Sequence, residues 1–146
     1  MRRDLSFDRV YPHPPERVWQ ALTDSRAVAK WFADNDFAPV VGHKFRFRTD
    51  PGPNYDGILY CEVTEVDPPR RLVYTFIGGY MEHTTLVTWT LTPVAEGTHV
   101  RLEHTGFTGL TDVAVADILS GGWLTQLQRL AGVLDGLDLA GESPPE

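Results

Sequence analysis

The sequence predicts an α+β fold in which a curved antiparallel sheet of about six strands packs on one long C-terminal helix. Two observations support this prediction. From residue 43 to residue 105 apolar residues recur with a period of two, and Pro and Gly clusters separate the runs, as in a meander of strands. Toward the C-terminus large apolar residues recur at spacings of three and four, which places them on one stripe of a helix that needs an apolar surface to cover it.

Length, charge and cysteine content narrow the class of protein. The 146 residues suit a single domain over residues 1–146, and the net charge of −7 argues against a nucleic-acid binder, which needs clustered Lys and Arg. The single cysteine, Cys61, excludes an internal disulfide, and we expect it to be a small buried residue without a chemical role. We recognise neither an export signal nor an apolar run long enough to cross a bilayer, so a cytoplasmic protein is expected.

The N-terminal part predicts one strand and then two short helices. Residues 5–11 alternate weakly, and the prolines that follow end this strand because proline lacks the N–H that a sheet requires. Proline is favoured in a first helical turn, so a short helix is expected near Pro15. A second short helix leads to Trp31, and Asp24 is among the side chains that can cap it.

Five further strands are expected after these helices, each bounded by turn residues. They cover residues 43–49, 56–66, 71–77, 81–92 and 98–105. In the first of them three basic residues alternate with Phe45 and Phe47, so one face is basic and the other is aromatic and buried. The basic face is interpreted as a solvated surface or, alternatively, as a contact for an acidic partner or a ligand carboxylate.

The last helix carries an apolar stripe and precedes a polar tail. The stripe consists of Trp123, Leu127, Leu130, Leu134 and Leu137. The helix starts either near Asp112, with a kink at Gly121-Gly122, or only at these glycines, since glycine costs helix stability in either place. Residues from about 138 to 146 are rich in proline and polar groups and are expected to form the tail.

Strand parity places His104 on the inward face of its strand, where it is the best single candidate for a polar pocket group or a general base. It shares a face with Val100 and Leu102, whereas His99 points outward, so no two-histidine metal site is expected on this strand. His104 is interpreted either as a satisfied core histidine or as a general base. A base needs a positioned partner, and Glu62 is either that partner or a surface carboxylate.

Aromatic side chains are expected to line a pocket between the sheet and the last helix. Trp89 is placed inward because the threonines around it form a polar face, while the pattern leaves the direction of Tyr60, Tyr74 and Phe76 open. Such a lining suits a flat or steroid-like ligand, and the alternative is that the rings simply fill the core. The candidate ligand-binding residues are Trp31, Phe45, Phe47, Tyr60, Tyr74, Phe76, Trp89, His104, Trp123 and Leu127.

Short motifs spread over nearly the whole chain resemble a known family in their order and spacing. They are Pro14-Pro15-Glu16-Arg17-Val18-Trp19, Leu22-Thr23-Asp24, Trp31-Phe32, Val66-Asp67-Pro68-Pro69-Arg70-Arg71-Leu72, Thr88-Trp89-Thr90-Leu91, His104-Thr105-Gly106-Phe107 and Gly122-Trp123. With these motifs the chain resembles the START-like (SRPBCC) superfamily, which has the helix-grip fold. Within that superfamily it is similar to the family related to the activator of the heat-shock-protein-90 ATPase.

The resemblance implies a fold more specifically than a function, because the superfamily shares one shape among lipid carriers, hormone-binding proteins, aromatase/cyclases, antibiotic-resistance proteins and co-chaperones. The leading hypothesis is a non-enzymatic protein that binds a small hydrophobic or aromatic molecule, with no metal or cofactor. One alternative is a cyclase- or hydratase-like enzyme that uses His104 as acid or base. Another is a module that contacts a chaperone, which the resemblance alone implies, and a homodimer is left open.

Overall fold

One antiparallel sheet and one long helix make up most of the structure. The computed structural model describes residues 2–53, 55–79 and 81–141, with the side chains of the last helix described as far as Gly136. The elements in chain order are β1 (Arg2–Tyr11), α1 (Pro15–Thr23), α2 (Ser25–Trp31), β2 (Asp34–Asn35), β3 (Lys44–Arg48), β4 (Ile58–Asp67), β5 (Arg71–Gly78), β6 (Thr85–Val94), β7 (Gly97–Thr108) and α3 (Gly109–Gly141). The seven strands form one sheet in the order β1-β7-β6-β5-β4-β3-β2.

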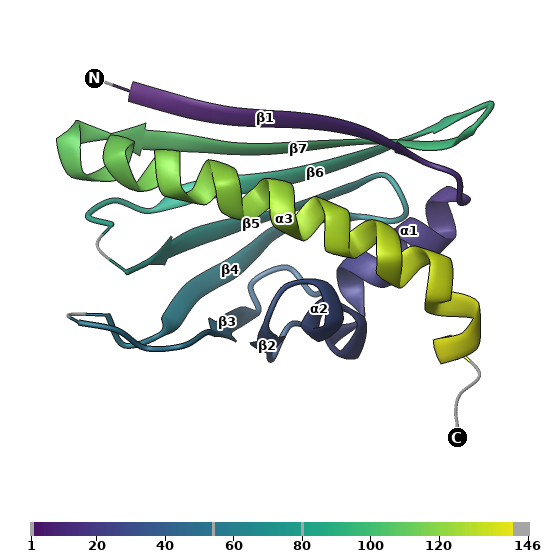
Figure 1. Cartoon of the computed structure of the whole chain (residues 1–146), viewed down its shortest axis with the longest axis horizontal. Coiled ribbons are helices and arrows are strands. Elements are labelled where there is room, and N and C mark those ends of the chain that lie inside the picture. Colours follow the sequence, from purple (N-terminus) through teal and green to yellow (C-terminus); the bar gives the residue numbers. More distant parts are fainter. Residues whose placement is uncertain (1, 54, 80, 142–146) are drawn as a thin grey trace.

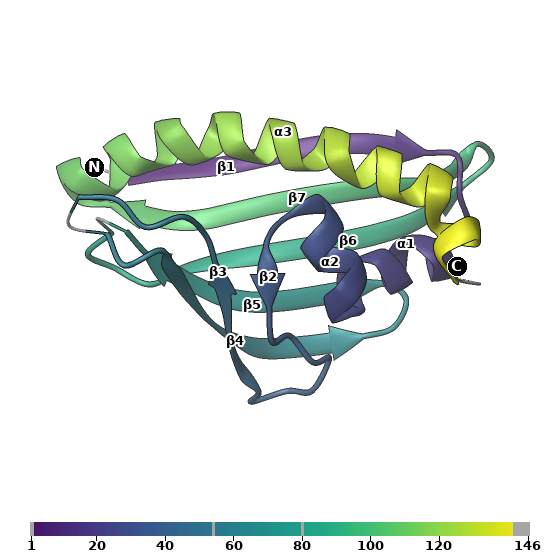
Figure 2. The same ribbon diagram turned by 60° about the horizontal axis from the view of Figure 1, so that its bottom comes forward.

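The long helix α3 lies along one face of this sheet, as Figures 1 and 2 show from two directions. It contacts β1 and β7 on the sheet, and the two short helices α1 and α2 pack against it near its C-terminal end (Figure 1). All strand pairs are antiparallel. The predicted α+β helix-grip fold, with two short helices after the first strand, is therefore confirmed.

The two short helices begin as the sequence predicts. Helix α1 has Pro15 in its first turn, and the side chain of Asp24 caps α2 by accepting hydrogen bonds from two backbone N–H groups. At the end of α2 the indole Nε1–H of Trp31 donates to the carbonyl oxygen of Ala21 in α1 at 2.9 Å. This bond ties the two helices together and turns the Trp31 ring into the core, where it is 2% exposed.

Strand β2 is an element that the sequence did not predict. It consists of only two residues, paired with the end of β3, and two residues are too few for an alternating pattern to appear. The side chain of Asn35 holds it in place: its amide donates to the carbonyl oxygens of Ser25 and Ala33, and its oxygen accepts from the N–H of Phe37. Side-chain hydrogen bonding, rather than strand propensity, thus fixes this edge of the sheet.

Helix α3 follows the longer of the two predicted alternatives. The chain passes from β7 into the helix at Gly109, whose φ of 84° lies in the left-handed region that glycine adopts without strain. Gly121 and Gly122 lie inside the helix, which is continuous across them (Figure 2). Although α3 has 33 residues, neither it nor any other helix in the described part of the chain is long and apolar enough to cross a bilayer.

The apolar stripe of α3 faces the sheet as predicted. Its buried members are Trp123, Leu127, Leu130 and Leu134, all at most 3% exposed. The side chain of Leu137 lies outside the described residues. The helix continues to Gly141, past the expected start of the polar tail at about residue 138, and residues 142–146 lie outside the described residues.

Candidate functional site

A cavity of about 290 Å³ lies between the first half of α3 and the nearby ends of β4 and β5. Its wall consists of Phe32, Thr49, Tyr55, Leu59, Phe76, Gly78, Gly79, Met81, Val115, Ile118, Leu119, Gly122, Trp123 and Gln126. Nearly all of these residues present apolar atoms. Met81 is only 9% exposed, whereas Ile118 is 73% exposed, so the cavity extends from the interior to the surface beside the helix.

Of the ten candidate residues from the sequence, only Phe76 and Trp123 line this cavity. Five other aromatic candidates are buried and pack on one another in the core: Trp31, Phe45, Phe47, Tyr74 and Trp89. The Trp31 and Trp89 ring centroids, for example, lie 5.6 Å apart with the rings edge to face. Leu127 is buried in the same core. These six residues therefore pack in the core and do not line this cavity.

The expected placement of Tyr60 in the pocket is wrong. In β4 the inward positions are Leu59, Cys61 and Val63, so Tyr60 falls on the outer face, where it is 47% exposed. Its hydroxyl donates to the carboxylate of Asp56 at 2.9 Å. Cys61 is buried as predicted, and burial raises the pKa of its thiol above the usual range, which keeps it protonated and unreactive.

His104 faces inward from β7, as strand parity predicts, and is fully buried. Its Nδ1 accepts a hydrogen bond from the indole Nε1–H of Trp123 at 2.9 Å, and its Nε2 lies 2.7 Å from the Thr85 hydroxyl. That hydroxyl donates its own proton to the carbonyl oxygen of Phe76 at 2.7 Å, so His104 Nε2 must carry the hydrogen of the shared bond. A neutral imidazole thus connects β5, β6, β7 and α3.

This network leaves His104 without a free atom for acid or base catalysis. Both ring nitrogens are bonded within the protein, and burial lowers the pKa of His104 to about 3. Glu62 is not its partner, because it shares the outer face of β4 with Tyr60 and lies opposite Lys44 of β3. His104 is therefore the satisfied core histidine of the two interpretations, and it fixes the orientation of the Trp123 ring that lines the cavity.

Gln126 is a polar wall residue that the sequence interpretation missed. Its Oε1 is buried and has no hydrogen-bond partner among the described residues. The signal was present in the helical spacing: Leu119, Gly122, Trp123 and Gln126 stand at positions i, i+3, i+4 and i+7 and so share one face of α3. A polar residue on that otherwise apolar face is the sequence feature that could have identified Gln126 as part of the wall.

The other polar side chains of the wall, Thr49 and Tyr55, are bonded to each other. The Thr49 hydroxyl donates to the carbonyl oxygen of Gly57 at 3.0 Å, so the Tyr55 hydroxyl is the donor in the bond that joins the two side chains. Both hydroxyl protons are thereby used within the protein. What these two groups still offer to the cavity is acceptor capacity.

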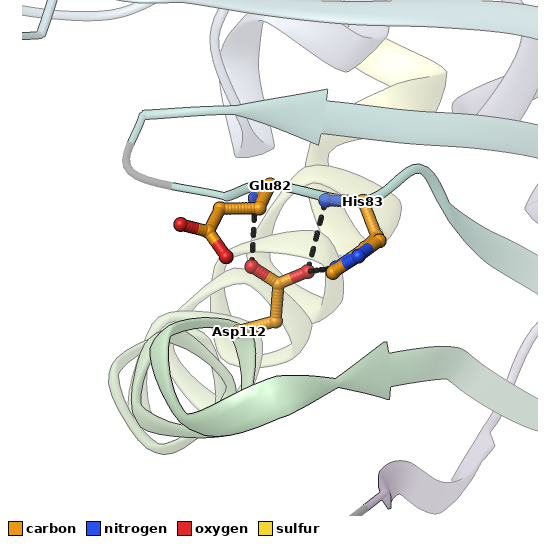
Figure 3. Close-up of side chains that lie close together, drawn as sticks. All are labelled: Glu82, His83 and Asp112. Carbon is orange, nitrogen blue, oxygen red and sulfur yellow. Dashed lines mark hydrogen bonds and ion pairs between the residues drawn. The ribbon is translucent and has the colours of Figure 1, made fainter.

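Beside the cavity, Asp112 joins the start of α3 to the connection between β5 and β6 (Figure 3). Its fully buried carboxylate accepts hydrogen bonds from the backbone N–H of Glu82 at 2.7 Å, from that of His83 at 3.0 Å, and from His83 Nδ1 at 2.9 Å. The joint holds Met81 of the cavity wall close to α3. Sequence interpretation missed it because about thirty residues separate Asp112 from its partners.

Among the described residues, the side chains of Glu82, His83 and Asp112 place their possible ligand atoms within 4.8 Å of one another, close enough to hold a metal ion. Both oxygens of Asp112 already accept N–H hydrogen bonds, two of them from backbone groups that cannot lose their protons. Each carboxylate oxygen has two lone pairs, so Oδ2, which accepts both bonds from His83, is filled and only Oδ1 keeps one for a metal. The arrangement is therefore accounted for by hydrogen bonding between the loop and the helix.

Several solved structures resemble this chain. Protein MLL2253 from Mesorhizobium loti is 35% identical, with 94% of this chain and 100% of that chain covered and a TM-score of 0.82. DynU16, a protein in the dynemicin biosynthetic locus, is 30% identical over 90% of this chain and 47% of its own, with a TM-score of 0.74. Bacillus halodurans protein BH1534 is 26% identical over 91% of this chain and 98% of its own, with a TM-score of 0.73.

A match to a family model assigns the chain to a protein family. No curated protein matches the sequence. The model described as "Activator of Hsp90 ATPase homolog 1-like protein" matches residues 12–135, which extend from the end of β1 almost to the end of α3. The match includes both short helices, six of the seven strands and the whole cavity wall. The chain therefore belongs to the family of activator of Hsp90 ATPase homolog 1-like proteins, as its motifs predicted.

Proposed function

We propose that this protein binds a small, mainly apolar molecule with one or two rings in the cavity between α3 and the sheet. The observation that carries the proposal is the cavity itself, whose described wall residues are mainly aliphatic and aromatic, with three polar side chains among them. Apolar walls with a few placed polar groups are typical of small-molecule sites, where burial supplies affinity and the polar groups supply orientation.

The size of the cavity favours the smaller of the ligands that are compatible with the sequence. At about 290 Å³ it lies at the lower end of the range of about 300–1,000 Å³ found for small-molecule pockets. The Phe76 and Trp123 rings offer flat surfaces for stacking. A one- or two-ring compound therefore fits better than the steroid-like ligand that the aromatic content alone suggested.

The composition of the wall favours binding over catalysis. Among the described residues that line the cavity, the only titratable side chain is Tyr55, whose proton is donated to Thr49. The sequence-based candidate for a general base, His104, lies behind Trp123 with both nitrogens bonded. Acid–base catalysis requires a proton donor or acceptor within hydrogen-bond reach of the reacting atom. The similarity to DynU16, a protein in the dynemicin biosynthetic locus, also supports a small organic ligand.

A thermal-shift screen tests this proposal, because a ligand that binds only the folded state raises the melting temperature. The compounds are one- and two-ring phenols, flavonoids, polyketides, fatty acids and sterols. We expect a dose-dependent rise with the small aromatic compounds and little or none with the sterols. A melting temperature that no class of compound raises would contradict the proposal.

Two matched variants locate the binding site. Gly122 lines the cavity and Gly121 is exposed, and a Cβ at either position meets no atom within 4 Å. Leucine at either position therefore replaces a glycine of the same helix without a backbone clash. We expect Gly122→Leu to fill the cavity and abolish the ligand-dependent shift, while Gly121→Leu retains it. A shift that survives in Gly122→Leu would place the ligand elsewhere.

A further inference from the structure

We infer that the ligand of this cavity carries a hydroxyl or N–H group that donates a hydrogen bond to Oε1 of Gln126, which makes Gln126 a residue that determines specificity. The inference rests on the proposed function, because it names the chemistry of the molecule that the same cavity binds. We therefore expect phenols and other compounds with a hydrogen-bond donor to bind more tightly than compounds that offer only acceptors.

The first step is the unsatisfied oxygen of Gln126. Its Oε1 is buried in the cavity wall without a hydrogen-bond partner among the described residues. Buried polar atoms in folded proteins are almost always paired, because an unpaired acceptor loses its bond to water and gains nothing in return. The missing partner is therefore a donor that enters the cavity.

A bound water is a poor candidate for that donor. Buried waters make about three hydrogen bonds, so such a water needs further polar partners close to Gln126. Its neighbours on the same face of α3 are Leu119, Gly122 and Trp123. The only side-chain donor among them, the Trp123 indole N–H, is already bonded to His104. A ligand hydroxyl is better suited, because the apolar walls hold the rest of the molecule in place.

The other polar groups of the wall point to the same ligand chemistry. The Thr49 and Tyr55 hydroxyls have donated their protons within the protein, so toward the cavity they can only accept. The described residues of the wall include no Lys, Arg or His, so a ligand carboxylate would be buried without a counter-charge. A neutral molecule with a donor is what these acceptors complement.

Three probes with one ring system test the inference: 2-naphthol, which donates and accepts, 2-methoxynaphthalene, which only accepts, and naphthalene, which does neither. Their dissociation constants for the full chain are measured by isothermal titration calorimetry. We expect 2-naphthol to bind about threefold to tenfold more tightly than the other two, the range that one net hydrogen bond supplies.

Matched variants assign the preference to Gln126. Gln126→Met keeps the length of the side chain and its helix propensity but leaves only a weak sulfur acceptor. Gln128→Met makes the same change at an exposed position of the same helix. We expect Gln126→Met to bind the three probes with similar affinity, and Gln128→Met to keep the preference for 2-naphthol.

The outcomes separate this inference from the proposed function. If the three probes bind the wild-type protein equally well, or the ether binds best because the Gln126 amide presents its nitrogen, the inference is wrong while the cavity is still a binding site. A preference for 2-naphthol that persists in Gln126→Met also overturns it. Failure of all three probes to bind contradicts the proposed function and the inference together.

Discussion

His104 holds the aromatic wall of the cavity in place through hydrogen bonds rather than through chemistry. It accepts from Trp123 in α3 and donates to Thr85 in β6, which in turn donates to the backbone of β5. Along this series of hydrogen bonds the Trp123 indole only donates and the Phe76 carbonyl oxygen only accepts, while His104 and Thr85 each do both. The neutral imidazole with its hydrogen on Nε2 is therefore the form that satisfies all of these groups. The residue thus orients the Trp123 ring without touching the cavity.

The burial of this neutral imidazole makes the folded state sensitive to acid. Burial lowers the pKa of His104 to about 3, whereas histidine in an unfolded chain titrates near 6.5. Between these two pH values the unfolded chain binds a proton that the folded protein does not. The free energy of unfolding therefore falls as the pH is lowered through this window, with a limiting contribution of about 1.4 kcal/mol per pH unit from this residue.

Urea unfolding of the wild-type protein and of His104→Gln between pH 4 and pH 7 measures this contribution. Glutamine retains one acceptor and one donor group, so it can replace the bonds to Trp123 and Thr85 without titrating. We expect the wild-type protein to lose stability more steeply than the variant as the pH falls. The four other histidines and all carboxylates are common to both proteins, so equal slopes would show that His104 does not titrate in this way.

At the scale of elements, α3 contains glycines in two different backbone conformations, left-handed at its start and helical in its interior. Gly109 has a φ of 84° and lets the chain turn from β7 into the helix, whereas Gly121 and Gly122 lie inside the helix. Glycine inside a helix costs about 1 kcal/mol relative to alanine. At Gly122 the absent side chain leaves room that belongs to the cavity, so the residue that lowers the stability of the helix also enlarges this cavity.

Alanine substitutions distinguish these roles. Gly121→Ala and Gly122→Ala are expected to raise the free energy of unfolding by about 0.5–1 kcal/mol each, because an added Cβ meets open space at both positions. Gly109→Ala is expected to lower it by about 1–2 kcal/mol, because alanine is strained at this φ. Chemical unfolding of the three variants measures the differences. A loss of stability in Gly122→Ala would mean that this part of the wall is already filled.

At the scale of the whole molecule, the sequence predicts the fold far better than the site. Periodicity reports which face of a strand or helix is buried, and it places His104, Trp89 and the α3 stripe correctly. It cannot tell a ring that fills the core from one that lines a cavity, because the cavity depends on where side chains are missing, as at Gly122. Strand β2 is too short to leave a periodic signal.

The hydrogen-bond partners of the buried polar groups could not be predicted from the sequence either. The bonds of His104 join residues 19 positions away on either side, and those of Asp112 span 29 and 30 positions. Such pairs are set by the packing of the sheet against α3 rather than by local pattern. The polar member of the cavity face, Gln126, was in principle predictable, since helical spacing alone places it beside Gly122 and Trp123.

The most direct measurement of the central claim is the methyl NMR spectrum of methionine-labelled protein titrated with 2-naphthol. The chain contains two methionines, so the methyl spectrum is simple, and Met81 lines the cavity, so its methyl signal reports on occupancy. We predict a saturable shift of the Met81 signal from the ring current of the ligand, retained in Gly121→Leu and lost in Gly122→Leu. A Met81 signal that does not move at saturating 2-naphthol, or that moves equally in Gly122→Leu, would contradict binding in this cavity.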